Sequence, residues 1–189
     1  MSIKPFKVDC KGLVFELDKN QVAKVVGSGL DLSFENWPDF AKYLSGGWFE
    51  EYTYMQFKPY KDAGVIKDLR INLKLRLSET TSSHFPDWRQ DYNELDVVFT
   101  DGHSLYIVEC KAGNITQDQV MKLQNLVRYY GGVGGRGIIA SCFEPNTKPI
   151  ERKIKDARLT LCCGETFSQK IKALMNGIAE RAKSKGDLV

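Results

Sequence analysis

The sequence has little net charge and no long apolar run. Its 27 Lys and Arg residues nearly balance 24 Asp and Glu residues, so the formal net charge of +3 does not by itself indicate a nucleic-acid-binding protein. No stretch approaches the ~18 apolar residues of a membrane-spanning helix, and the first residues lack the apolar core of a signal peptide. We therefore expect a cytoplasmic protein without a membrane partner.

Patterns that build zinc sites or disulfide frameworks are missing. The five cysteines are an odd number and include no Cys-x-x-Cys pair. The two histidines, His84 and His103, have no neighbours that suggest a zinc motif or a Ser-His-Asp arrangement. We expect reduced thiols. Carboxylates and lysines remain as the candidate catalytic groups.

The length of 189 residues with 42% hydrophobic residues suits one globular domain. We divide it into an N-terminal extension, residues 1–46, which packs on the core, and a main domain, residues 47–189. Hydrophobic periodicity predicts an α-β-β-β-α-β order, and hence an α/β fold. The predicted strands are a short one around 13–17, then 69–77, 95–100, 104–111, 137–142 and 159–162. The predicted helices are 37–44, 48–58, one after the Thr116 capping box, 150–157 and 167–182.

The second and third of these strands predict a hairpin. A two-residue turn at residues 101–102 would pair Thr100 with His103. Continued along both strands, this register places Asp96 opposite Ile107.

Charged residues continue one face of the predicted hairpin. Glu109 and Lys111 share the face of Ile107, so Asp96 would lie diagonally from Glu109, at ~7–8 Å between backbones. Glu94 would lie directly opposite Glu109, and facing like charges destabilise a strand pair unless a cation separates them.

These side chains suit phosphodiester hydrolysis. Asp96 and Glu109 offer oxygen ligands for Mg²⁺ or Mn²⁺, and Lys111 offers an ammonium that positions the attacking water or stabilises the transition state. The alternative is a solvated Glu-x-Lys pair at a strand end.

The same residues resemble a known family. Residues 93–98 (NELDVV) and 105–111 (LYIVECK) resemble the D…(E/D)-x-K signature of the PD-(D/E)XK nuclease superfamily. Residues 45–52 (SGGWFEEY), 122–132 and 135–136 resemble the nuclease domain of CRISPR ancillary nucleases activated by cyclic oligoadenylate. The resemblance covers roughly residues 36–165 and implies a restriction-endonuclease-like core, with a mixed sheet flanked by helices.

The resemblance implies a metal-dependent endonuclease acting on DNA, RNA or both, in CRISPR-linked antiviral defence and as a homodimer. It makes Asp96 and Glu109 metal ligands and Lys111 the catalytic lysine. Glu50 or Glu51 would add an acid from the first core helix, and the helical pattern does not choose between them. Lys122 would line the site, although an exposed helix lysine is the alternative.

Only about 46 residues precede the first core helix, too few for the sensor domain of these nucleases. We therefore do not transfer activation by cyclic oligoadenylate, and a separate sensor or regulatory partner is one alternative. A catalytically silent nucleic-acid-binding or assembly module with the same fold is another.

Overall fold

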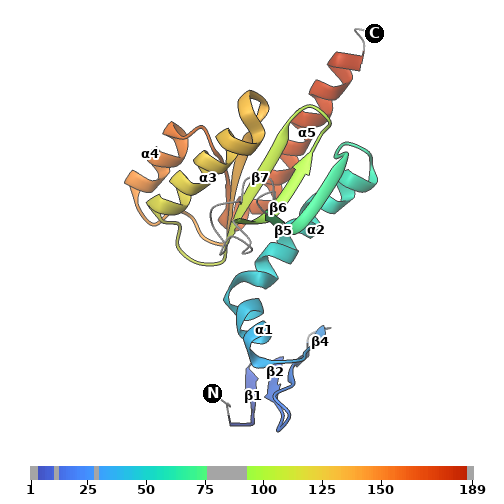
Figure 1. The fold of residues 1–189 in the computed structure, drawn as a ribbon, viewed down its shortest axis with the longest axis vertical. Helices are drawn as coiled ribbons and strands as arrows, with labels where there is room; N and C mark the ends of the chain where they lie inside the picture. The colour runs from blue at the N-terminus through green and yellow to red at the C-terminus, as the bar shows by residue number, and fades with distance from the viewer. Residues whose placement is uncertain (1–3, 11–12, 28–29, 76–92, 187–189) are drawn as a thin grey trace, which may run out of the picture. The chain divides into compact units, whose positions relative to one another are not determined.

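A computed structural model describes residues 4–10, 13–27, 30–75 and 93–186. The chain forms two compact units, Met1–Trp48 and Phe49–Val189 (Figure 1). The packing of residues 1–46 on the core stays a prediction. None of the described helices combines the length and apolar character needed to cross a membrane.

The smaller unit is an antiparallel meander with one helix. Its strands are β1 (Phe6–Cys10), β2 (Leu13–Leu17), β3 (Ala23–Gly27) and β4 (Leu30–Phe34), paired in chain order. Phe40, on α1 (Trp37–Lys42), is buried with Leu17 and Val25. Asn36 caps α1, and a π-helical turn, η1 (Tyr43–Gly47), follows it. The sequence predicted a strand only around residues 13–17 of this sheet.

The larger unit is built on a five-stranded sheet with the order β5-β6-β7-β8-β9. The first three strands are antiparallel and the last two run parallel to β7, which makes the sheet mixed. The strands are β5 (Asp68–Leu75), β6 (Asn93–Thr100), β7 (Leu105–Lys111), β8 (Arg136–Ser141) and β9 (Thr160–Cys163). The helices are α2 (Trp48–Asp62), α3 (Gln117–Gly131), α4 (Lys148–Asp156) and α5 (Phe167–Gly186), with short turns η3 (Gly132–Gly134) and η4 (Gly164–Thr166).

Helices cover both faces of this sheet. Phe57 of α2 and Ile171 of α5 are buried against Val108 on one face. Leu123 of α3 and Ile154 of α4 join the core that contains Ile107 on the other face (Figure 1). This alternation along β7 confirms the predicted period of two, and it places Glu109 and Lys111 on the α3 side.

The predicted hairpin turn is wrong by two residues. Thr100 pairs with Leu105, not with His103, so the loop has four residues. The carboxylate of Asp101 explains the longer loop, because it accepts hydrogen bonds from the backbone N–H groups of His103 and Ser104, both at 2.8 Å. A shift of two residues does not by itself move a side chain to the other face of the sheet.

The pairing of β5 with β6 is interrupted once. Ile71 pairs with Val97 and Leu73 with Leu95, and the position between these pairs, where Asn72 faces Asp96, is not paired. Asn72 has a φ of 52°, in the left-handed region. At this point the apolar side chains of both strands switch from one core to the other. On β6, Val97 belongs to the core under α2 and α5, whereas Leu95 belongs to the core under α3 and α4.

Candidate active site

Asp96 and Glu109 face each other where the β6–β7 ladder ends. The last recorded pair is Val97 with Val108, and the same register places Asp96 directly across from Glu109. The predicted diagonal is therefore wrong, because the loop is two residues longer than expected. The Oδ2 atom of Asp96 accepts a hydrogen bond from the backbone N–H of Cys110 at 2.7 Å. This bond fixes the Asp96 carboxylate beside β7.

Glu94 does not face Glu109, contrary to the prediction. Its partner is Lys74 on β5, so an opposite charge stands next to it. The facing pair of like charges is Asp96 and Glu109. A cation would therefore relieve the repulsion between Asp96 and Glu109, and not between Glu94 and Glu109.

Glu109 and Lys111 form a buried ion pair. The Nζ atom of Lys111 lies 2.7 Å from Oε1 of Glu109, and their side chains are 23% and 9% exposed. Burial opposes the ammonium charge, but the Glu109 carboxylate outweighs it and raises the pKa of Lys111. Lys111 is therefore a protonated cation at neutral pH, which suits it to stabilise negative charge and not to accept a proton.

The Asp96 carboxylate has a raised pKa. Burial raises its pKa to about 6, and the charge of Glu109 acts in the same direction. The Cys110 N–H and the Lys111 ammonium oppose this shift, while the charge of Glu50 adds to it. Three carboxylates therefore share one region of negative potential.

The two candidate acids of α2 differ in position. Glu50 is partly buried, and its charge raises the pKa values of both Asp96 and Cys110. Glu51 is exposed, and its charge is not among the causes of either shift. The structure therefore brings Glu50, and not Glu51, toward Asp96.

Lys122 lies outside this carboxylate cluster. It is exposed on α3, in a groove of about 800 Å³ whose lining includes Asn93, the first residue of β6. Arg128 and Tyr129 line the same groove, and Tyr129 is 79% exposed. Asn93 is three residues from Asp96, so the groove adjoins the strand that carries the site.

The donor set fits a divalent cation held by few protein ligands. Within the described residues no group of three or more His, Cys, Asp or Glu side chains is arranged to hold a metal ion. Two carboxylates, Asp96 and Glu109, remain, and Mg²⁺ is commonly bound by one or two carboxylates together with water and substrate phosphate. The raised pKa of Asp96 supports this fit, since a cation would offset the negative potential that raises it.

One site feature, Asn72, was missed from the sequence. The apolar alternation of β5 runs through it without a break, so periodicity gives no warning. Its residue type is the available signal, because asparagine is among the few residues that adopt positive φ readily. His84 lies outside the described residues.

The chain matches a family model described as "Card1-like, endonuclease domain" over residues 39–180. Two similar solved structures are protein VC1899 from Vibrio cholerae, with a TM-score of 0.62 and 22% identity, and Can2 from Sulfobacillus thermosulfidooxidans in complex with cyclic tetra-adenylate (cA4), with a TM-score of 0.55 and 23% identity. No curated protein matches the chain.

The likeness to these structures covers 84% and 77% of this chain, but 40% and 37% of theirs. The chain thus spans less than half of their length. The shared fold confirms the predicted restriction-endonuclease-like α/β architecture, with its mixed sheet between helices.

Proposed function

Because the chain belongs to the family of Card1-like endonuclease domains, we propose that it hydrolyses phosphodiester bonds of DNA or RNA at Asp96, Glu109 and Lys111. The observation that carries this proposal is the meeting of Asp96 with the Glu109–Lys111 ion pair where the β6–β7 ladder ends. Charged groups buried on an otherwise apolar face are costly without such a role.

Asp96 and Glu109 would hold Mg²⁺ or Mn²⁺, which when bound stabilises charge on a phosphate and lowers the pKa of a water molecule. Lys111 would neutralise Glu109 while the site is empty of substrate, and would turn its ammonium to the developing charge of the phosphate. Glu50 would add an acidic group near Asp96. Lys122 would contact the nucleic acid from the neighbouring groove.

The regulation of the chain is proposed from one similar structure. Can2 was solved with cA4, and the likeness covers 37% of that chain. We infer a CRISPR-linked defence role, with control by a separate sensor or regulatory partner. A homodimer is part of the same proposal.

The test is cleavage of labelled single- and double-stranded DNA and RNA with Mn²⁺, with Mg²⁺ and with EDTA. We expect cleavage with the metals, none with EDTA, and a loss of about 10²-fold or more in Glu109→Gln and Lys111→Gln. The exposed residues Glu165 and Lys172 supply matched controls, Glu165→Gln and Lys172→Gln, which should retain activity.

Cleavage that survives both site substitutions would overturn the mechanism. Binding without cleavage under every condition would favour a catalytically silent binding module. Cleavage that requires an added partner would favour a controlled subunit.

A further inference from the structure

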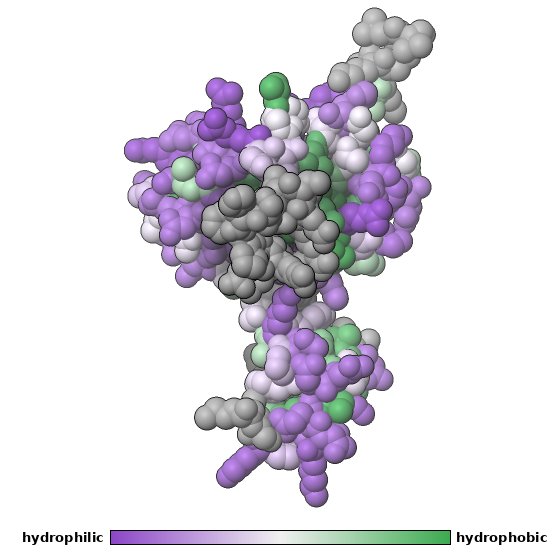
Figure 2. Space-filling view, in the orientation of Figure 1, coloured by the Kyte–Doolittle hydropathy of each residue, from purple (hydrophilic) through white to green (hydrophobic). Residues whose placement is uncertain are grey.

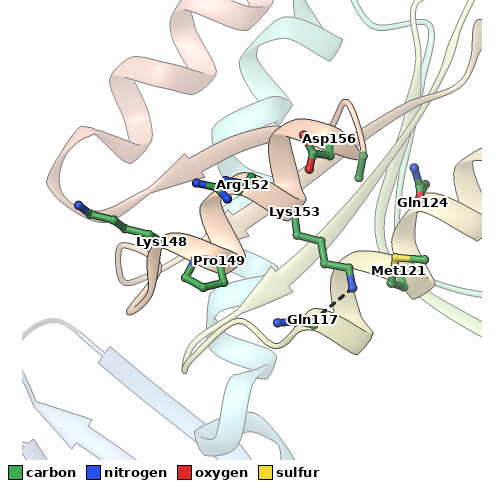
Figure 3. Close-up of a pocket in the computed structure, with 9 residues that line it drawn as sticks. Gln117, Met121, Gln124, Lys148, Pro149, Arg152, Lys153 and Asp156 are labelled. Atoms are coloured by element: carbon green, nitrogen blue, oxygen red, sulfur yellow. Dashed lines mark hydrogen bonds between the residues drawn. The ribbon is translucent and has the colours of Figure 1, made fainter.

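A groove of about 500 Å³ separates α3 from α4, on the sheet face that also carries Glu109 and Lys111. Figure 3 shows its lining, with Lys153 reaching from α4 to α3. The lining comes from both helices and includes Gln117 and Met121 of α3 and Lys148, Arg152, Lys153 and Asp156 of α4.

The groove has an excess of positive charge. Three cations and one carboxylate line it, and no ion pair joins Lys148 or Arg152 to an acid within the described part of the chain. Lys153 donates a hydrogen bond to the neutral amide oxygen of Gln117 at 3.2 Å (Figure 3). The three cations therefore exceed the single carboxylate of the groove, Asp156, by two charges.

Another basic surface of the larger unit differs in this respect. Arg70 on β5 lies 3.0 Å from the carboxylate of Asp68, so its charge is already balanced. The side of the unit formed by α3 and α4 is also mainly hydrophilic, with few apolar side chains at its surface (Figure 2). A polar, cationic and open surface fits a phosphate backbone better than an apolar protein partner.

The groove also opens at the edge of the sheet where the site lies. Lys111 pairs with Ser141 at the carboxyl ends of two parallel strands. Six residues lead from Lys111 to Gln117, the first residue of α3, and seven lead from Ser141 to Lys148, the first residue of α4. Gln117 therefore lies at most ~20 Å from Lys111, which equals the rise of about six base pairs of B-DNA.

We propose that the α3–α4 groove binds the phosphate backbone of the nucleic-acid substrate, with Lys148 and Arg152 contacting phosphates. The two residues are one helical turn apart on α4, with ~5–6 Å between their Cβ atoms. The contacts would be independent of base sequence. This inference rests on the proposed nuclease function, because the substrate it positions is the one cleaved at Glu109 and Lys111.

The test measures binding separately from cleavage. Fluorescence anisotropy with labelled oligonucleotides, over a salt series in EDTA, would use Glu109→Gln protein as the parent. Adding Lys148→Gln or Arg152→Gln should weaken binding by about five-fold each, the effect of one charge pair in water. Each should also reduce the slope of log K against log salt by ~0.7–0.9. Lys172→Gln, on α5 across the sheet, is the matched control and should leave both values unchanged.

Unchanged affinity and slope in the Lys148 and Arg152 variants, or an equal loss in the Lys172 control, would overturn the groove proposal. If the otherwise wild-type enzyme still cleaves in that case, the proposed function stands without the groove. Failure of the parent protein to bind any nucleic acid would also overturn the groove proposal, whatever the cleavage result. Circular dichroism checks that the parent, changed at the buried Glu109, and the variants, whose added changes lie at exposed positions, remain folded.

Discussion

The carboxylate of Asp96 accepts a hydrogen bond from the backbone N–H of Cys110 at 2.7 Å, just beyond the last residue pair of the β6–β7 ladder. This contact keeps Asp96 beside β7 although burial and the charge of Glu109 both favour its neutral form. The site therefore stores unfavourable electrostatic free energy in its ionised state. A cation or a proton would release it.

The first prediction concerns Asp96 and pH. Its pKa is raised from 3.8 to about 6 in the folded protein, so folding favours the protonated form. This stabilisation is fully present below pH 3.8 and is lost as the pH rises through about 6. The free energy of unfolding is therefore about 3 kcal/mol lower above this pH range than below it, at about 1.4 kcal/mol per pKa unit.

Asp96→Asn should therefore raise the free energy of unfolding well above pH 6, by up to about 3 kcal/mol, and leave it unchanged below pH 3.8. Urea unfolding over a pH series measures this difference. Glu165→Gln, at an exposed position, is the control and should show no such trend. Equal stabilisation by Asp96→Asn at both ends of the pH range would contradict the prediction.

A second prediction concerns divalent cations. Mg²⁺ or Mn²⁺ should raise the melting temperature of the wild type above pH 6, where Asp96 is ionised, and EDTA should reverse the effect. The rise should be absent in Asp96→Asn and Glu109→Gln. Differential scanning fluorimetry measures this without any cleavage. A rise of equal size in these variants would show that the cation binds elsewhere.

Much of the site geometry follows from strand periodicity. The face shared by Glu109 and Lys111 was predicted correctly, because a register error of two residues preserves side-chain direction. The predicted diagonal placement of Asp96 relative to Glu109 was wrong, because it depended on the length of one loop. That length is set by hydrogen bonds of the Asp101 carboxylate, which alternation does not report.

Other features depend on tertiary contacts. The capping box at Thr116 predicted the start of α3 correctly, because its hydrogen bonds are local. The choice between Glu50 and Glu51 was open, since it depends on which side of α2 faces Asp96. The short strands of the smaller unit carry charged residues such as Lys24 between apolar ones, and five-residue segments give weak periodic signals.

The third prediction compares the two neighbouring acids of α2. Glu50→Gln should lower the cleavage rate by about 10²-fold, because the partly buried Glu50 acts on Asp96, whereas Glu51→Gln, at an exposed position, should have little effect. Single-turnover cleavage measures both. Glu50→Gln should also lower the pKa of Asp96, seen by NMR titration of its carboxyl carbon. The reverse order of the two variants would exchange their roles.

The fourth prediction concerns the exposed ring of Tyr129. The ring contacts Tyr130 edge-on, with centroids 4.9 Å apart, and is open to solvent beside Lys122. Tyr129→Ala should weaken the binding of single strands by about 1–3 kcal/mol, the value of one stacked base, and leave duplex binding unchanged. Tyr129→Phe keeps the ring and should bind normally. Equal losses for single strands and duplexes would exclude stacking, as would normal binding by Tyr129→Ala.

The last prediction concerns the conformation of Asn72 opposite Asp96. Its φ of 52° suits asparagine or glycine but strains a β-branched residue. Asn72→Val should lower the free energy of unfolding by about 1–2 kcal/mol, although the exposed side chain loses little packing, and Asn72→Gly should stay near the wild type. Urea unfolding measures both variants. If the left-handed turn also fixes Asp96, cleavage should fall in Asn72→Val and persist in Asn72→Gly. A valine variant as stable as the wild type would show that β5 does not need this turn.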